Sequence, residues 1–254
     1  MEVALKKGFT LAETLITIGL IGIVAALTLP LLISRYNEKV TIAQLRKTYA
    51  ELSQSIQMSE VHNGSFKDWD YSLPQKEFAE QYILPYLAKG AQKCYSSCFA
   101  GENYWKNING TFREDGEYFV APHYKYNDKT IVINNQNIQR QDMNDIKYVN
   151  FIVDINGDRG ASIMGKDVFM FTLFNYTYLT GGWVTTPLCP QGEHYGLYLG
   201  SIGGYWGSYC GTLEGILGQD SVRGSCKPNG SGDNCGLAIE KNGWKIPDKY
   251  PIKF

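Results

Sequence analysis

Residues 9–33 read FTLAETLITIGLIGIVAALTLPLLI, and Glu13 is the single charged residue in this run. About twenty apolar residues are enough to cross the hydrocarbon core of a bilayer as an α-helix. Two lysines precede the run, and Arg35 and Lys39 follow it, so the flanking charges orient the span only weakly. We therefore expect residues 9–33 to form one transmembrane helix.

Two other kinds of N-terminal segment compete with this interpretation. A secretory signal peptide has an apolar core of roughly 7–15 residues, closed by a small-residue cleavage site. The run here is longer, has no A-x-A site at its end, and leads into an amphipathic segment. A plain signal anchor explains the length but not Glu13, because a charged side chain in a span is costly and usually functional. The alternative for Glu13 is that it lies near the lipid headgroups and is tolerated there.

A cut between Gly8 and Phe9 would give Glu13 a function. It would create a new α-amino group on Phe9, and Glu13 would become the fifth residue of the mature chain. A carboxylate buried in a bundle of such helices needs a positive partner, because an unpaired buried charge is strongly destabilising. The Phe9 amine of a neighbouring copy is the natural candidate, and this pairing would set the axial register between copies.

The string KKGFTLAE, from Lys6 to Glu13, resembles the cleavage and methylation motif of type IV prepilins and type II secretion pseudopilins. The resemblance implies a leader of residues 1–8, removed by a prepilin peptidase that cuts after Gly8 and methylates Phe9. It also implies that Glu13 registers the subunits, and that Pro30 is the helix-breaking proline common in this family.

The same resemblance implies a structural subunit of a type IV pilus or a secretion pseudopilus. Its expected partners are other pilin or pseudopilin subunits, the prepilin peptidase, an inner-membrane assembly platform and the lipid bilayer. It would be a single-pass inner-membrane protein with a periplasmic head, later part of a periplasmic or extracellular filament. The net charge of −1 argues against a nucleic acid partner.

Residues 34–62 continue the helix with an amphipathic pattern. An apolar stripe recurs at spacings of three and four, which is typical of one face of a helix; it consists of Ile42, Leu45, Tyr49, Leu52 and Ile56. Pro30 is expected to bend or loosen the helix, because it has no amide donor. Gly64 should end this helix, and a second helix is expected from Pro74 to Lys89, with Pro85 kinking or ending its first half.

Residues 63–254 are expected to form the head. Segments rich in Val, Ile, Phe and Tyr predict strands; they are Glu117–Ala121, Thr130–Asn134, Tyr148–Ile155 and Val168–Tyr176. Val149, Phe151 and Val153 alternate with less apolar positions, as in a sheet covered on one face. The expected fold class is α+β, with the long N-terminal helix packed on an antiparallel sheet.

The six cysteines all lie in the predicted head: Cys94, Cys98, Cys189, Cys210, Cys226 and Cys235. An even set in an exported domain indicates disulfides. We expect local pairs, 94 with 98, 189 with 210 and 226 with 235. Reduced thiols in the cytosol are the alternative. A zinc site is disfavoured because no C-x-x-C pair occurs and the three histidines are far apart in sequence.

Oxygen-bearing side chains gather at Asp154, Asn156 and Asp158, with Asp167 downstream. Such alternation around a glycine can wrap calcium, and Asp167 could complete the shell. Some pseudopilins hold calcium in a head-domain loop, so the resemblance favours it. The match to an EF-hand is poor, however, because Arg159 stands where glycine belongs. The alternative is a hairpin turn without metal, since Asn-Gly-Asp is a strong turn former. No other cofactor is indicated.

Two other functions remain open from the sequence. The first is a minor pilin whose head acts as an adhesin or ligand-binding module. Aromatic side chains in the glycine-rich stretch 181–211 could contact a sugar or a partner, or simply cover the sheet as part of the core. The second is a membrane-anchored enzyme. No G-x-S-x-G, H-E-x-x-H or phosphate-binding glycine loop supports it, so we expect no catalytic residues.

Overall fold

The computed structural model describes residues 10–87, 91–94, 105–111, 122–140, 143–157, 162–177, 193–200, 213–217 and 226–254. The chain divides into two compact units, of which the first ends at Val40 and the second spans Thr41–Lys253. Helix α1, Leu11–Asn63, contributes to both.

The first unit contains the apolar part of α1. Its large side chains are exposed within the chain, from Leu11 at 80% to Ile33 at 55%. An 18-residue window reaches a mean hydropathy of 2.5, so this helix is long and apolar enough to cross a membrane. The helix continues through Pro30. The predicted long apolar helix is therefore present, and its length and composition fit a membrane span.

The second unit begins with the amphipathic part of α1. Leu45, Leu52 and Ile56 are buried, while Ile42 and Tyr49 pack against the same core. The Tyr49 ring stacks on Phe171 with centroids 6.5 Å apart. The predicted apolar stripe is thus confirmed, and burial of its side chains fixes this part of the helix to the sheet.

Gly64 follows the last residue of α1 with a φ of +78°. Its amide donates to the carbonyl of Glu60 at 3.0 Å. A left-handed glycine just after a helix satisfies a terminal carbonyl and stops the helix. The predicted end of the helix at Gly64 is confirmed.

The helix predicted from Pro74 to Lys89 is instead three short pieces. They are α2 (Gln75–Phe78), the π-helical turn η2 (Ala79–Ile83) and the 3₁₀ turn η3 (Leu84–Tyr86), preceded by the 3₁₀ turn η1 (Phe66–Asp68). The Leu84 amide reaches back five residues to the Ala79 carbonyl. Pro85 has no amide and its ring clashes with an α-helical carbonyl four residues back, so the helix widens before it and tightens after it. Lys89 lies outside the described residues.

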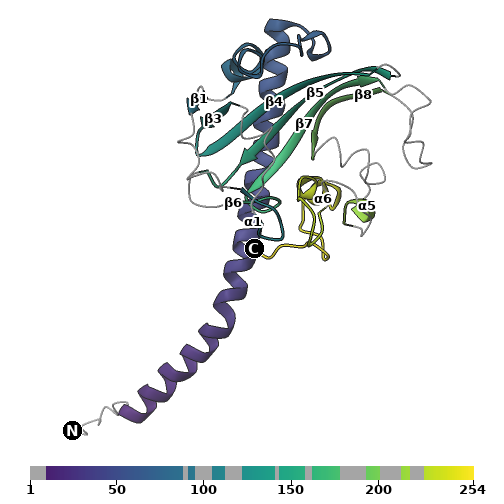
Figure 1. Ribbon diagram of the computed structural model, residues 1–254. Helices are drawn as coiled ribbons and strands as arrows, with labels where there is room; N and C mark the ends of the chain where they lie inside the picture. Colours follow the sequence, from purple (N-terminus) through teal and green to yellow (C-terminus); the bar gives the residue numbers. More distant parts are fainter. Residues whose placement is uncertain are drawn as a thin grey trace. The chain divides into compact units, whose positions relative to one another are not determined.

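Six strands form an antiparallel sheet in the order β1-β3-β4-β5-β7-β8. They are β1 (Gln92–Cys94), β3 (His123–Tyr126), β4 (Lys129–Arg140), β5 (Met143–Asp154), β7 (Val168–Thr177) and β8 (Glu193–Leu199). The long strands β4, β5 and β7 lie side by side with β8 (Figure 1). Two predicted strands lie within β4 and β7, and the third, Tyr148–Ile155, matches β5 except for its last residue; the fourth, Glu117–Ala121, lies outside the described residues. The α+β class is therefore established.

Both faces of this sheet are covered. Val149, Phe151 and Val153 alternate on the face that packs against α1, as predicted. The opposite face carries a second apolar cluster, in which Val132, Ile152 and Met170 of the sheet meet Trp105 and Met164. Trp105 belongs to a small parallel pair of strands, β2 (Trp105–Lys106) and β6 (Ser162–Ile163). The expectation of a sheet covered on one face was thus incomplete, because the two-residue strands are too short to show a pattern.

A polar row follows the apolar row on this second face. Asn134, Asn150 and Thr172 are register partners across β4, β5 and β7. All three are buried. The Thr172 hydroxyl lies 2.8 Å from Oδ1 of Asn150 and 2.7 Å from the carbonyl oxygen of Gly200. Oδ1 of Asn134 accepts instead from the Gln75 and Gln136 amides, each at 2.7 Å, so every member of the row has a hydrogen-bond partner.

The C-terminal region packs on the sheet through two short helices, α5 (Leu213–Leu217) and α6 (Cys235–Lys241), which lie side by side (Figure 1). Cys226 and Cys235 form a disulfide with their Cα atoms 4.8 Å apart, the pair expected from the sequence. Cys94 is also in a disulfide. Cys98, Cys189 and Cys210 lie outside the described residues.

Candidate functional site

Glu13 caps the start of α1. Its Oε2 accepts the Thr10 amide at 2.8 Å and the Thr10 hydroxyl at 2.9 Å. In return, the Glu13 amide donates to Oγ1 of Thr10 at 3.3 Å. This reciprocal pair is a capping box, in which residues three apart satisfy each other's unpaired donors. The T-x-x-E spacing of a capping box is visible in the sequence, although the prediction for Glu13 was based on its charge alone.

The carboxylate of Glu13 also lies on an apolar surface. Its neighbours one turn away, such as Ile16 at 70% exposed, present hydrocarbon outward. Among the described residues, both hydrogen bonds that this carboxylate accepts come from Thr10. Glu13 thus has a local partner but no described cation. Gly8 and Phe9, the predicted processing residues, lie outside the described residues, and Pro30 stands within α1.

The predicted calcium loop is held by hydrogen bonds to its own backbone. Asp154 is fully buried, and its Oδ1 accepts the Asn156 amide at 2.8 Å. Oδ2 of Asp167 accepts the Ile163 amide at 3.1 Å. These contacts are those of a tight turn, the alternative interpretation of this sequence.

Of the four predicted calcium ligands, Asp158 lies outside the described residues. Within the described part of the chain, no three His, Cys, Asp or Glu side chains gather in a group able to hold a metal ion. Asp154 ends β5, and Asp167 directly precedes β7, the antiparallel neighbour of β5. The two residues lie at the same end of this strand pair, where the Ile155 amide donates to the Asp167 carbonyl at 2.8 Å. Calcium binding by this loop stays a prediction.

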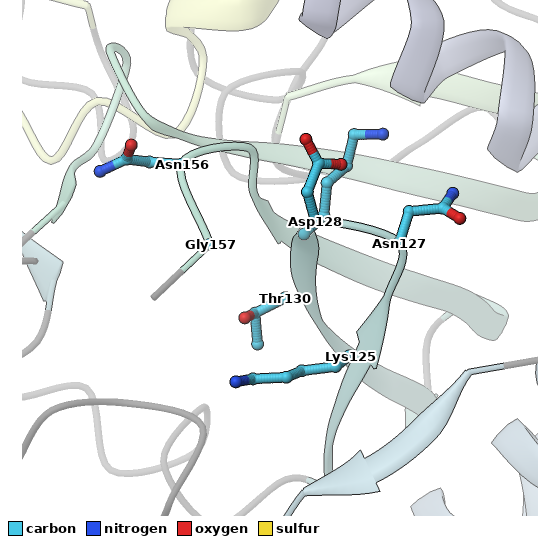
Figure 2. A pocket seen from close by; sticks show the side chains of 7 residues that line it. Lys125, Asn127, Asp128, Thr130, Asn156 and Gly157 are labelled. Atoms are coloured by element: carbon cyan, nitrogen blue, oxygen red, sulfur yellow. The ribbon is translucent and has the colours of Figure 1, made fainter. Parts of the chain in front are cut away.

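A pocket of about 340 Å³ opens beside this loop, between the β3–β4 turn and the segment that follows β5 (Figure 2). Among the described residues, its lining consists of Lys125, Asn127, Asp128, Lys129, Thr130, Asn156 and Gly157. The side chains of Lys125 and Thr130 run to the same side of the hairpin, whereas Asp128 and Asn127 extend elsewhere (Figure 2). Sequence reasoning missed this pocket, because strand pairing brings the two segments together.

The backbone of Gly157 closes one side of the pocket. Its φ is +66°, a conformation that L side chains rarely adopt. A Cβ at this position would collide with the carbonyl oxygen of Asp128. The turn at Asn127 is also left-handed, with a φ of 54°. The two turns therefore approach each other as closely as backbone allows.

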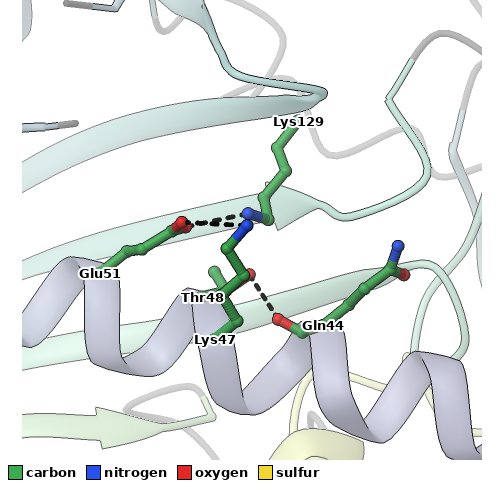
Figure 3. A network of polar contacts seen from close by, with 5 residues as sticks. All are labelled: Gln44, Lys47, Thr48, Glu51 and Lys129. Carbon is green, nitrogen blue, oxygen red and sulfur yellow. Dashed lines mark hydrogen bonds and ion pairs between the residues drawn. The ribbon is translucent and has the colours of Figure 1, made fainter. Parts of the chain in front are cut away.

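Lys129 lines the pocket but directs its charge elsewhere. Its Nζ lies 2.9 Å from Oε2 of Glu51 on α1, and its side chain is 2% exposed (Figure 3). Lys47 approaches the other oxygen of Glu51 at 3.8 Å. The Lys129 ammonium also lies 5.2 Å from the centre of the Tyr126 ring. A charge pair in such a buried setting ties α1 to the sheet.

Thr130 forms the inner wall of the pocket. The residue is fully buried, and among the described residues its hydroxyl has no hydrogen-bond partner. It pairs in register with Lys125 on one side and with Asp154 on the other. A buried hydroxyl without a partner is uncommon, because the loss of water is not compensated.

Most of the aromatic stretch 181–211 lies outside the described residues. Tyr198 is described: it is half-buried on β8 and packs edge-on against Phe174, with ring centroids 5.5 Å apart. Leu199 beside it is buried. For this part of the stretch, the aromatic side chain contributes to covering the sheet.

These elements define an α+β protein with a candidate membrane helix at the start of the described chain and a polar pocket on its sheet domain. Residues 31–254 match a family of unknown function, DUF6613. The chain therefore belongs to that family. No curated protein and no solved structure matches it.

Proposed function

We propose that this chain is a pilin-like or pseudopilin-like filament subunit, processed after Gly8 and held in the membrane by α1. The observation that carries the proposal is a single carboxylate, Glu13, near the start of a helix whose apolar side chains are exposed. Apolar side chains are well solvated by lipid hydrocarbon, whereas a charged carboxylate is costly to place there. An assembly of such helices supplies what the lone carboxylate needs, an amine from the next copy.

The helix surface around Gly19 and Gly22 supports assembly. Nothing in the chain comes within 4 Å of a Cβ placed at either position. Small residues in membrane helices allow a second helix to approach closely. A bundle of copies could therefore pack along this part of α1.

The disulfide between Cys226 and Cys235 supports a head outside the cytoplasm. Disulfides persist in oxidising compartments such as the bacterial periplasm and are rare in the cytosol. A single N-terminal span would place the head in such a compartment.

Mass spectrometry of the protein recovered from membranes tests the processing step. The mature chain is expected to begin at Phe9 with one N-methyl group. Replacing Gly8 by a bulkier residue should leave the full-length chain. Gly19→Ala is the matched control, since it changes a glycine in the span, and it should be processed normally. Recovery of wild-type protein that still begins at Met1 would overturn the proposal.

A second candidate is the ligand-binding form of the same subunit, a minor pilin whose head recognises a molecule outside the cell. The pocket beside the β3–β4 turn favours it. Its described lining is rich in polar side chains, and pockets of this size are typical of small-molecule sites.

A further inference from the structure

We propose that residues 241–253 dock the sheet domain onto an anionic phospholipid surface. This C-terminal segment contains a single acid, Asp248, and four exposed lysines, Lys241, Lys245, Lys249 and Lys253. Four positive charges against one negative give the segment a formal charge of +3, although the whole chain carries −1. The proposal rests on the membrane anchor of the proposed function, and it is independent of leader processing and of filament assembly.

Apolar side chains fix this segment to the sheet domain. Trp244, Ile246 and Tyr250 pack against the main apolar core. The Trp244 amide donates to the carbonyl of Ile239 at 2.9 Å, and the Tyr250 hydroxyl donates to the carbonyl of Gly165. The lysines alternate with these anchored residues and are exposed. The segment therefore presents its positive charges from a fixed surface, so that docking it costs little backbone entropy.

The ammonium groups of the segment are available to an external partner. Among the described residues, Lys245, Lys249 and Lys253 form no ion pair or side-chain hydrogen bond, and neither does Asp248 between them. Lys241 interacts electrostatically with the half-buried acid before it in the sequence, so it is the weakest of the four anchors. The other three lysines carry the proposed contact.

Two cations from elsewhere in the chain border the segment. The Lys166 ammonium donates to the carbonyl oxygen of Lys253 at 3.3 Å. The guanidinium of Arg46, an exposed residue of α1, lies 5.2 Å from the centre of the Trp244 ring. Both add positive charge beside the lysines of the segment. The cationic surface thus draws on three separate parts of the fold.

A lipid surface is the polyanion that suits this arrangement. Basic side chains within a Debye length of anionic headgroups, about 8 Å at physiological salt, are attracted to them. Lipids move laterally, so the lysines of an irregular segment need no particular spacing. Helix α1 continues without interruption from its apolar part to Arg46, and a domain tethered to a membrane span meets the bilayer at high effective concentration. The net charge of −1 disfavours nucleic acid as the partner.

Lysine acetylation, followed residue by residue with mass spectrometry, tests the proposal on the full-length protein in lipid nanodiscs. Phosphatidylcholine discs are compared with discs in which about a third of the lipid is phosphatidylglycerol. Lys245, Lys249 and Lys253 should react at least about threefold more slowly in the anionic discs, because headgroups cover them. Salt at about 0.5 M should restore the faster rates by screening. Lys76 on α2, with a side chain 54% exposed, should react equally in both discs.

A double variant, Lys245→Gln with Lys249→Gln, tests whether the segment docks as a unit. It removes two exposed charges and no buried contact, so the melting temperature should not change. Lys253 should then react about as fast in anionic as in neutral discs, because the remaining charges attract the surface too weakly. The matched control, Lys67→Gln with Lys76→Gln, replaces two exposed lysines outside the segment and should keep the protection of Lys253.

The proposal is overturned if Lys245, Lys249 and Lys253 react equally fast in both kinds of disc, or if Lys76 slows to the same extent. It is also overturned if duplex DNA protects these lysines in neutral discs more strongly than anionic lipid does, since nucleic acid would then be the preferred partner. A chain that stays in solution without lipid would refute the membrane anchor itself, and with it this proposal.

Discussion

Glu13 caps the start of α1, and we propose that its charge also pairs with an amine of another copy. Its carboxylate oxygen accepts hydrogen bonds from Thr10, which a neutral glutamine can also do in a capping box. Only the charged form can pair with an amine from another copy. Glutamine and alanine at this position therefore distinguish capping from charge pairing.

We predict that Glu13→Gln and Glu13→Ala both reduce incorporation into filaments, each by about tenfold or more, because each removes the charge that the proposed pair between copies requires. Only Glu13→Ala should also weaken the first turn of the helix. Immunoblots of sheared filaments, normalised to membrane-bound protein, measure the effect. Thr14→Ala is the control and should assemble normally. Full assembly of Glu13→Gln would show that capping is the sole function.

Gly157 and Gly243 share a left-handed backbone but differ in their surroundings. Their φ values are +66° and +68°, yet only Gly157 lies against another backbone segment, at Asp128. Gly243→Ala should therefore cost only the conformational penalty, about 1–2 kcal/mol. Gly157→Ala should cost more, about 3 kcal/mol or above, because the turns must also separate. Urea denaturation measures both, and equal values would contradict the close contact.

At the scale of elements, the ion pair between Lys129 and Glu51 joins α1 to the sheet. Glu51→Gln leaves an almost fully buried ammonium without its charge partner, so the free energy of unfolding should fall by about 3 kcal/mol. Lys47→Gln removes the outer, exposed lysine and should cost under about 1 kcal/mol. Chemical denaturation compares them. A small effect of Glu51→Gln would mean that solvent reaches Lys129 in place of the carboxylate.

Long elements could be predicted from the sequence and short ones could not. The stripe at Leu45, Leu52 and Ile56 shows the helical period over several turns, and the predicted strands in β4, β5 and β7 are runs of five to nine residues rich in Val, Ile, Phe and Tyr. Strands of two to four residues, such as β2 and β6, contain too few positions for any period to show. The helix predicted from Pro74 had the correct start, but Pro85 acts on the turn before it as well as on the turn after it.

At the scale of the whole molecule, one candidate site could be predicted from the sequence and the other could not. Glu13 could be predicted because a charged residue within an apolar run is visible in the sequence alone. The pocket could not, because Lys125 and Asn156 meet only through the pairing of β3 with β4 and of β4 with β5. Nothing in either short segment indicates its partner.

The buried tyrosines predict how the domain responds to alkali. Burial raises the pKa of Tyr124 to about 12, and it also raises the pKa values of Tyr71, Tyr126 and Tyr250. In the unfolded chain tyrosine ionises near pH 10, at about its reference value. Because the folded values are higher, these residues contribute stability that is complete below about pH 10 and is lost as the pH rises toward 12.

Absorbance at 295 nm and circular dichroism, followed together, check this prediction. A fraction of the tyrosines should ionise only as the dichroism signal collapses. Ionisation of all tyrosines near pH 10 with the dichroism unchanged would contradict their burial.

The polar row of Asn134, Asn150 and Thr172 has a consequence for how the strands find their alignment. A slip by one position turns every side chain to the wrong face, but a slip by two keeps the faces correct and is the more dangerous error. Here a two-residue slip would set an amide against Ile152 or Met170 and strand its hydrogen-bonding groups in hydrocarbon. This mismatch destabilises the alignment slipped by two residues, so the polar row favours a single pairing of the strands during folding.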